Sequence, residues 1–515
     1  MRLPTGGDLL VDCLVRHGVT HVFSIIGGQM GTIYDAIGRR EEIEVVTPRN
    51  ETGAALMACG FTASSGRISV SMATVGAGVV YEVAGLAKAW FDYIPVVSIA
   101  PQVQSYRVKP HQESLQACEQ DELFLPITKW NTIVYHWRRI PQMIDRAFRE
   151  ALQGIPGPVH VDIPVDVLFR RKVLSDRRES RLLVEPARTR YAGVVGGDAA
   201  GMREAAEALG GSEKPLVLVG QGFGRPGRSR GVGSILEEME LPVLTTTHSS
   251  GVMPPESGCY AGDLCAFTRS EQGLEVLSGV DLLVLLGIDR YSKDLVGALD
   301  GAAEVIQVEL DPRAFVTGRR GLHRVNADPE TALAFFAGEL QTGRNASWTD
   351  QVVSAGRQAA ARESREVGSA DGILAVLDGI GGDDTILVAD GKLSLRVAGR
   401  ALTDARYRDL FMMDGRDVGG AGLPFAIGAA IANPSDRVIL LSDKRALFYH
   451  VRELQPAACE GIGIDVICFD DGAAGAVDTA SVLDGLGCSV MTFEEPKSAA
   501  AFLAGKRAIP RALLL

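Results

Sequence analysis

The 515-residue sequence contains no apolar run of 18 residues, no run of lysine and arginine suited to binding a phosphate backbone, and no Cys-x-x-Cys pair. The first absence argues against a membrane-spanning helix, and residues 1–18 follow an amphipathic rather than a secretory pattern. The second absence, together with a net charge of −12, argues against binding to the phosphate backbone of nucleic acids. The third argues against a zinc site, and the eight scattered cysteines suit core thiols in a reducing compartment. We therefore expect a cytoplasmic protein with no nucleic-acid or membrane partner.

What the sequence does contain is short apolar runs that alternate with segments of helix length. Apolar residues form 46% of the chain and charged residues 23%, proportions typical of a globular protein. The runs are HVFSII, EVVTP, ISVSMA, VVSIA and VHVDIP, then PLVLVG, LPVLTTT, DLLVLLG and EVIQVEL, and finally TILVAD, DRVILLSD, IDVICFDD and ALLL. Such alternation predicts an α/β fold with three doubly wound parallel-sheet domains.

Breaks in this alternation divide the chain into three domains. The length is about three times that of a typical domain. A charged stretch interrupts the alternation after the first set of runs, and a polar, helix-like stretch follows the second set. We predict a first domain over residues 1–170, a linker over 171–190, a middle domain over 191–344, a linker helix over 345–366 and a third domain over 367–515.

Four stretches carry a resemblance to a known family. They are PRNETGAALMACGFTASSG and PGPVHVDIPVDV in the first domain, KPLVLVGQG at the start of the second and GGAGLPFAIGAAIANPSDRVILL in the third. In this order the chain resembles thiamine-diphosphate-dependent enzymes of the acetohydroxyacid synthase (acetolactate synthase) type. The resemblance implies a pyrimidine-binding, a middle and a diphosphate-binding domain, with the active site between the subunits of a homodimer or homotetramer. It also implies a small-molecule substrate.

The resemblance places catalytic residues in the first domain. Glu51 follows the run EVVTP and stands where the family has the carboxylate that protonates the aminopyrimidine ring of the cofactor. This role needs a carboxyl group buried enough to hold or share a proton near neutral pH. The alternative is a structural carboxylate favoured by the dipole of a helix N-terminus. His111 and Gln112 align with the family's Phe-Gln-Glu triplet. An imidazole titrates near working pH, so His111 is a candidate acid/base group, with a solvated loop histidine as the alternative.

The diphosphate motif departs most from the family's residues. The family has Gly-Asp-Gly, followed about 26 residues later by two asparagines, and the aspartate and one asparagine help to hold Mg²⁺. Asp443, Lys444 and Arg445 align with Gly-Asp-Gly here, and Asp470 and Asp471 align with the asparagines. An ammonium group cannot ligate Mg²⁺, so we expect Lys444 to pair with Asp470 or Asp471 in the place of the metal. In the alternative, Lys444 and Arg445 bind the diphosphate directly.

Other cofactor contacts of the family are changed as well. Gly419 stands where the family has a bulky apolar residue that holds thiamine in its bent form, although Leu423 in the following Gly-Leu-Pro is kept. Gly76 and Gly78 are kept in the first-domain loop, but its polar end is replaced by Val79-Val80-Tyr81. The FAD motif of the middle domain is altered too. We therefore expect no FAD, and we expect neither Mg²⁺ nor thiamine diphosphate to bind in the conventional way.

Three functions remain open from the sequence. The first is an acetolactate-synthase-like enzyme that acts on a small 2-oxo acid or carbonyl compound, with Glu51 and His111 as acid/base groups and a remodelled cofactor site. The second is a working thiamine-dependent carboligase or decarboxylase in which Lys444 and Arg445 replace the metal. The third is a catalytically silent partner or regulatory homologue. Calorimetric titration with thiamine diphosphate, with and without Mg²⁺, separates the second from the others.

Overall fold

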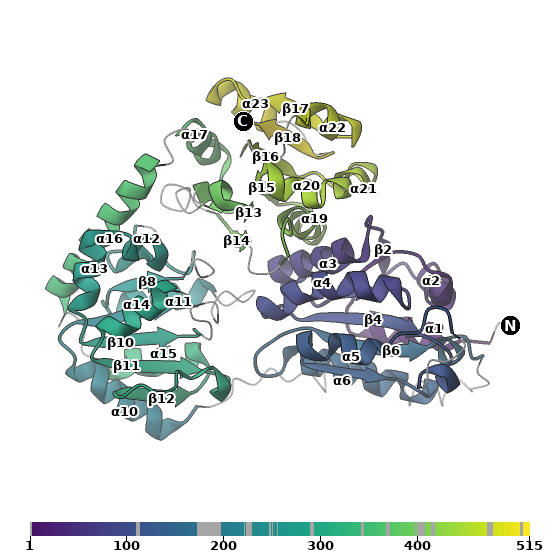
Figure 1. Cartoon of the computed structure of the whole chain (residues 1–515), viewed down its shortest axis with the longest axis horizontal. Helices are drawn as coiled ribbons and strands as arrows, with labels where there is room; N and C mark the ends of the chain where they lie inside the picture. The colour runs from purple at the N-terminus through teal and green to yellow at the C-terminus, as the bar shows by residue number, and fades with distance from the viewer. Residues whose placement is uncertain are drawn as a thin grey trace. The chain divides into compact units, whose positions relative to one another are not determined.

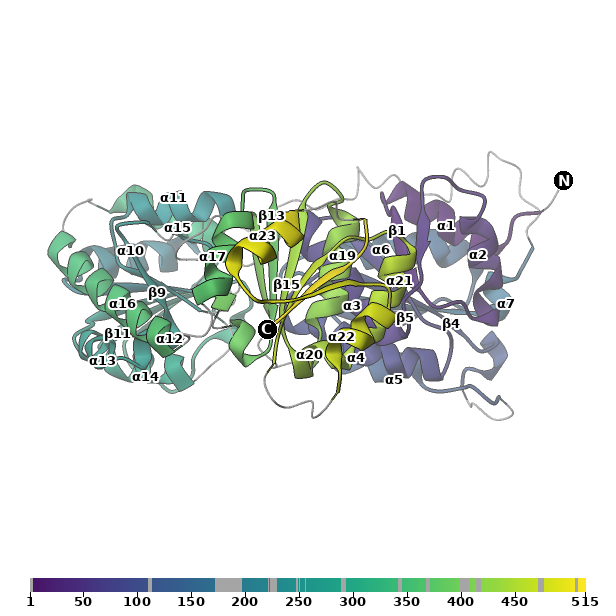
Figure 2. The same ribbon diagram turned by 90° about the horizontal axis from the view of Figure 1, so that it is seen from above.

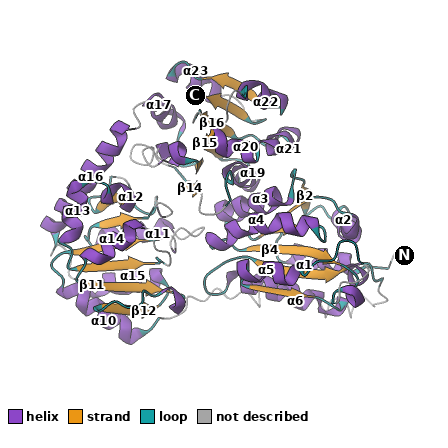
Figure 3. Ribbon diagram, in the orientation of Figure 1, coloured by secondary structure: helices purple, strands orange, loops and turns teal. Residues whose placement is uncertain are grey.

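Three six-stranded sheets, each flanked by helices, organise the chain in the computed structural model (Figure 1; Figure 3). Neighbouring strands pair in parallel, so the predicted α/β class with three parallel-sheet domains is confirmed. None of the described helices combines the length and hydropathy needed to cross a membrane. The eight cysteines are free, and the cytoplasmic location stays a prediction. The structure describes residues 3–109, 114–171, 197–220, 222, 229–246, 249, 251–254, 256–288, 293–340, 345–366, 371–395, 397–398, 407–413, 418–470, 477–504 and 508–515.

The first sheet has the strand order β2-β1-β3-β4-β6-β5. Its strands are β1 (His21–Ser24), β2 (Glu44–Val46), β3 (Ser69–Met72), β4 (Val96–Gln102), β5 (Trp130–Ile133) and β6 (Val159–Pro164). One face packs on α1 (Gly6–Arg16) and α6 (Ile140–Leu152), and there alternate strand residues such as Val97 and Ile99 join the main apolar core. The other face lies under α3 (Glu51–Ser65) and α4 (Ala77–Phe91), as Figure 1 shows for β4.

Two helices of this domain, α1 and α3, begin at residues whose side chains accept hydrogen bonds from free backbone N–H groups. Thr5 and Asp8 form a capping box on α1, in which the Asp8 N–H donates to Thr5 Oγ1 at 3.2 Å and the Thr5 N–H donates to Asp8 Oδ2 at 2.6 Å. Asn50 caps α3 by accepting the Gly53 N–H at 2.6 Å. These caps fix the position at which each helix begins, and hence the position of Glu51 in the first turn of α3.

The middle domain carries the sheet β12-β11-β10-β7-β8-β9. The sequence runs predicted β7 (Pro215–Val219), β8 (Val243–Thr245), β10 (Leu282–Leu286) and β11 (Glu304–Glu309), and the edges β9 (Tyr260–Asp263) and β12 (Leu322–Asn326) are additional. Of the expected linker, residues 172–190 lie outside the described residues. The expected linker helix is α16 (Ala346–Glu366). Its Trp348 is buried in the middle-domain core and donates to the Pro215 carbonyl at 2.8 Å, so α16 is part of this domain.

The third sheet has the order β14-β13-β15-β16-β18-β17. Its strands are β13 (Thr385–Asp390), β14 (Asp409–Met413), β15 (Arg437–Asp443), β16 (Asp465–Phe469), β17 (Ser489–Thr492) and β18 (Arg511–Leu514). The chain divides into two compact units. One contains residues 1–192, 413–493 and 505–515, and the other contains residues 193–412 and 494–504.

Within the first of these units, α3 packs closely against α19 (Gly422–Ala432) of the third domain (Figure 1; Figure 2). Glycines permit this approach, because a methyl group at Gly60 would lie 1.9 Å from the Phe425 carbonyl oxygen, and one at Gly428 would lie 1.9 Å from the Met57 carbonyl oxygen. Asn433 adds a hydrogen bond across the contact, donating to Ser64 Oγ at 2.8 Å. The backbones of α3 in the first domain and α19 in the third domain are therefore in direct contact.

Candidate active site

Glu51 lies at the first turn of α3 and is buried. The preceding strand β2 ends at Val46, and the Asn50 cap fixes the turn between them. Thr52 ties α3 to α4 by donating to the Tyr81 carbonyl at 2.6 Å. The carboxyl group expected to hold a proton is thus placed in a buried, rigid setting. Its position in the first helical turn also fits the alternative of a structural carboxylate.

Gly76 and Gly78 lie where α4 begins, Gly76 as the N-cap residue and Gly78 in the first helical turn against Glu51, and we call this segment the Gly76–Gly78 turn. Gly76 has a φ of 81°, which favours glycine, and a methyl group there would lie 2.7 Å from the Gln116 carbonyl oxygen. A methyl group at Gly78 would lie 2.8 Å from Glu51 Oε1. The structure therefore brings the predicted residues Glu51, Gly76 and Gly78 into one region, where the backbone of Gly78 lies close to the Glu51 carboxyl group.

Two residues that the sequence did not single out lie nearby, Glu453 beside the residues that precede and begin α3, and Gln116 beside Gly76. Glu453, at the end of the short helix η9 (Val451–Glu453), is buried and accepts the Arg49 N–H at 2.9 Å through Oε2. Burial raises the pKa of Glu453 to about 7, although hydrogen bonds from the Arg49 and Asn50 N–H groups oppose the shift. Gln116 accepts a hydrogen bond from Gln29 at 2.6 Å. The local sequence VREL, in which Arg452 and Glu453 are both charged, gives no signal that Glu453 is buried.

Two of the predicted residues cannot be placed. His111 and Gln112 lie outside the described residues, so their catalytic role stays a prediction. Beyond the C-terminal end of that segment, the backbone carbonyl of Gln116 faces Gly76. The next helix, α5 (Gln120–Phe124), sends Gln120 to the same turn, where its Oε1 accepts the Gly76 N–H at 3.2 Å.

The predicted diphosphate residues lie at the C-terminal end of β15, where α20 (Lys444–Tyr449) begins. Lys444 is buried, and its Nζ lies 3.7 Å from Asp470 Oδ2 and donates to the Val477 carbonyl at 3.3 Å. The ion pair expected with Asp470 is therefore present, and Asp471 lies outside the described residues. Asp443 is buried at the N-cap position, whereas Arg445 is exposed.

These residues do not fit a magnesium ion. An ammonium group offers three donors and no lone pair, and Lys444 places one beside the Asp470 carboxylate that a metal would need. Among the described residues, no group of three His, Cys, Asp or Glu side chains is arranged to hold a metal ion. Lys444 therefore places a positive charge beside Asp470 at this strand end.

The thiamine wedge is also absent from its expected place. A methyl group at Gly419 would lie 3.4 Å from the Tyr449 ring, so the aromatic ring of α20 lies beside this position. Leu423 is buried in α19, where it packs as a core residue. The described residues at this point do not supply the bulky apolar side chain that the family uses.

Comparisons with known proteins agree with this architecture. Sequence models of the thiamine pyrophosphate enzyme match the N-terminal TPP binding domain over residues 4–123, the central domain over 202–334 and the C-terminal TPP binding domain over 397–506. Similar proteins include acetolactate synthase isozyme 1 large subunit of Escherichia coli, which is 27% identical over 92% of this chain and 83% of its own length. The acetolactate synthase of Arthrospira platensis is 28% identical, again over 92% of this chain and 83% of its own length.

Proposed function

Because the chain belongs to the thiamine pyrophosphate enzyme family, we propose that it is an acetolactate-synthase-like enzyme with Glu51 as its acid/base group. Its substrate class is a small 2-oxo acid or carbonyl compound. The observation that carries the proposal is the buried Glu51 carboxyl group, which is held at the start of α3 with Gly78 against its Oε1 atom. A carboxyl group in this setting can give and take a proton while bulk water is kept away.

The Mg²⁺ and thiamine site is remodelled in this proposal. The family's cofactor supplies a carbanion that adds to carbonyl carbon, and its diphosphate is normally held through Mg²⁺. Lys444, paired with Asp470, stands in the metal's place, and Gly419 lacks the wedge. We assign Lys444 the role of a fixed internal cation that balances Asp470 at the end of β15.

A second candidate is a working thiamine-dependent carboligase or decarboxylase in which Lys444 and Arg445 replace the metal. It is favoured by the two matching TPP binding domains and by the exposed position of Arg445 beside Lys444. Two adjacent cations at a strand end suit phosphate oxygens. The two candidates differ in whether thiamine diphosphate binds, and in whether Mg²⁺ changes that binding.

One experiment separates these candidates. The full-length protein is titrated with thiamine diphosphate in a calorimeter, with and without Mg²⁺, and is then incubated with a panel of 2-oxo acids while CO₂ release is measured. The first proposal expects turnover without appreciable binding of thiamine diphosphate, whether or not Mg²⁺ is present. Metal-independent binding with turnover favours the second candidate. An absence of both binding and turnover overturns both, and leaves a silent homologue.

We also propose that the chain self-associates as a homodimer or homotetramer. Val80 and Tyr81 are 55% and 60% exposed on α4, next to the Gly76–Gly78 turn, although both carry large apolar groups. A second copy that covers them would complete the surroundings of Glu51. Sedimentation velocity is expected to give a dimer or tetramer, and a strictly monomeric active protein would contradict this proposal.

A further inference from the structure

The first sheet breaks its apolar pattern on one face. Strands of a parallel sheet that is covered on both faces are usually almost continuously apolar. Ser71 of β3, Ser98 of β4 and His160 of β6 are nevertheless in register on neighbouring strands, and Asp162 lies two residues further along β6. All four are buried, on the face opposite the main core. Buried polar groups are costly unless they bind one another.

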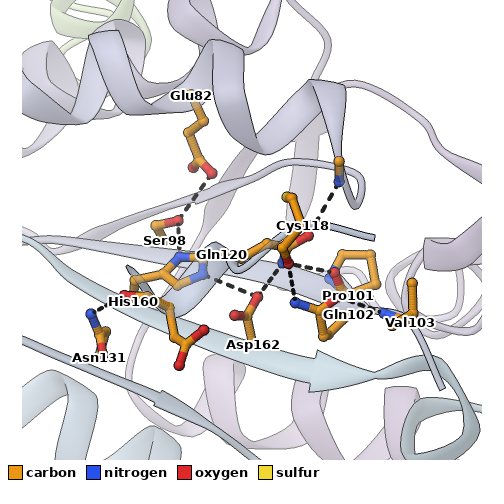
Figure 4. A network of polar contacts seen from close by, with 12 residues as sticks. Glu82, Ser98, Pro101, Gln102, Val103, Cys118, Gln120, Asn131, His160 and Asp162 are labelled. Carbon is orange, nitrogen blue, oxygen red and sulfur yellow. Dashed lines mark hydrogen bonds and ion pairs between the residues drawn. The ribbon is translucent and has the colours of Figure 1, made fainter. Parts of the chain in front are cut away.

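Figure 4 shows that Ser98, His160 and Asp162 form a continuous path with Glu82 of α4. Ser71 donates to Glu82 Oε1, and Ser98 Oγ lies 3.0 Å from Glu82 Oε2. The same Ser98 hydroxyl lies 2.8 Å from Nδ1 of His160, and Nε2 of His160 lies 3.1 Å from Asp162 Oδ1. The side chains of Glu82, His160 and Asp162 are completely buried. Three titratable groups are thus connected without exposure to bulk water.

This geometry allows two hydrogen-bond arrangements with the same number of protons. In one, protonated Glu82 Oε2 donates to Ser98 Oγ, and Ser98 donates to Nδ1 of a neutral His160, whose Nε2 lies 3.1 Å from Asp162 Oδ1. In the other, the Glu82 O–H bond is broken, a new Nδ1–H bond is formed, and Ser98 donates to Glu82 instead. The Ser98 hydroxyl passes one proton on and receives another, so charge and atoms balance.

The path ends at the proposed active site. Gln120 Nε2 donates to Asp162 Oδ1 and, at 3.2 Å, to the Pro101 carbonyl. The other end of the Gln120 amide accepts the Gly76 N–H at 3.2 Å. Gly76 begins the turn whose Gly78 abuts Glu51. The position of this turn therefore depends on a hydrogen bond that is anchored by Asp162.

We propose that Glu82, Ser98 and His160 share one buried proton and, through Asp162 and Gln120, act as positioning residues for the Gly76–Gly78 turn beside Glu51. The catalytic consequence rests on the proposed function, whereas the sharing of the proton is a property of the protein alone. Phe124 stacks on the His160 ring with centroids 3.8 Å apart and closes the network from α5.

The charged surroundings are consistent with a shared proton. Burial raises the pKa of Glu82 to about 7, and the negative charge of Glu51 adds to that shift. The charge of His160 and the hydrogen bonds from Ser71 and Ser98 lower the pKa of Glu82 and so oppose this shift. Among the described residues, titratable groups also face this network from other elements. They are Glu51 of α3, Cys118 before α5 and Tyr135 after β5.

Infrared difference spectroscopy of the full-length protein tests the sharing directly, because a protonated carboxylic acid has a C=O band that carboxylates lack. We expect a band that titrates near pH 7 and disappears in Glu82→Gln. In His160→Gln its midpoint moves upward by about one pH unit, because the positive partner is lost, and in Glu51→Gln it moves downward. A missing band in the wild type, or the same midpoint in His160→Gln, overturns the proposal.

Ser98 provides a second test, which remains informative if Glu82→Gln does not fold. Ser98→Ala removes the bridging hydroxyl, so the midpoint is expected to rise, and Ser98→Thr, which keeps a hydroxyl, is expected to restore it. His323→Gln is the matched control, because His323 pairs with Glu204 and Glu304 in the middle domain. Equal midpoints in Ser98→Ala and Ser98→Thr contradict a hydroxyl relay.

Activity provides a separate readout. With an established substrate, His160→Gln is expected to change the pH profile of kcat/KM by displacing the midpoint, while His323→Gln leaves the profile unchanged. An altered infrared midpoint with an unaltered pH profile overturns the link to catalysis. If no substrate is turned over, the proposed function fails, and the infrared result still decides whether the proton is shared.

Discussion

The side chain of Glu51 has two interpretations that a single substitution separates. Glu51→Gln keeps the size and much of the hydrogen bonding but removes the transferable proton. If Glu51 is the acid/base group, turnover is expected to fall by about 10²–10⁴-fold while the melting temperature is nearly unchanged. Steady-state kinetics and thermal unfolding measure the two effects. Unchanged activity, or a loss of stability alone, would make Glu51 a structural carboxylate of the α3 N-terminus.

Lys444 gives a prediction about cofactor rescue. Lys444→Asp with Asp471→Asn rebuilds two metal ligands of the family, so binding of thiamine diphosphate is expected to become dependent on Mg²⁺. Binding should stay weak until Gly419→Met is added, and that side chain must displace the Tyr449 ring. Calorimetric titration measures each step, with the exposed Lys497→Asp as a charge-matched control. Tight binding by the wild-type protein would contradict the remodelled site.

At the residue scale, motifs identified candidate site residues, but long-range contacts could not be predicted. Glu51 and Gly78 come from separate motifs, and the structure brings them together. Glu453 was missed because its partner Arg49 is 404 residues away in the sequence, and no local pattern specifies such a contact. The pairing of Lys444 with Asp470 could be predicted because both residues follow neighbouring parallel strands.

Among the secondary-structure elements, every strand that the sequence missed lies at the edge of a sheet. The missed strands are β5 in the first sheet, β9 and β12 in the second, and β14 and β17 in the third. Central strands are covered on both faces and are therefore continuously apolar, which makes them easy to recognise. Edge strands such as Trp130–Ile133 are only partly buried and carry polar residues, so no apolar run identifies them.

The contact between α3 and α19 predicts a strong effect from one methyl group. Gly60→Ala is expected to lower the free energy of unfolding by about 1–3 kcal/mol, because the helices must separate to accommodate the new carbon. Gly338→Ala near the end of α15 (Pro329–Glu339) is the control, since a methyl group there meets no atom within 4 Å. Urea unfolding measures both. Equal stability of the two variants would contradict the close contact.

Glu453 predicts how stability depends on pH. Its pKa is raised from 4.5 to about 7 in the folded protein, so between these values the folded state binds more protons than the unfolded state. The free energy of unfolding therefore falls as pH rises through this window, by about 3 kcal/mol in total from this group. Glu453→Gln removes this contribution, and the exposed Glu460→Gln retains it. If the free energy of unfolding depended on pH in the same way in the wild type and in Glu453→Gln, the raised pKa of Glu453 would be contradicted.

The whole molecule consists of two compact units, each with its own apolar core. Such units commonly unfold as separate cooperative transitions. Differential scanning calorimetry is expected to show two transitions, of which Gly60→Ala lowers only the one that belongs to the unit containing α3. His323→Gln, in the other unit, should leave that transition in place. A single transition that Gly60→Ala shifts as a whole would show that the units unfold together.

The packing of α3 against α19 also affects how the chain is made. Every residue of α3 from Glu51 to Ser64 is buried in the folded protein, and part of its cover comes from a helix near the far end of the sequence. At about 5–20 residues per second, a ribosome takes roughly 20–80 s to add the 404 residues between Arg49 and Glu453. For the part of that time after the first domain is complete, the face of α3 that packs on α19 has no partner. The nascent chain must therefore be protected from aggregation until its last third is synthesised.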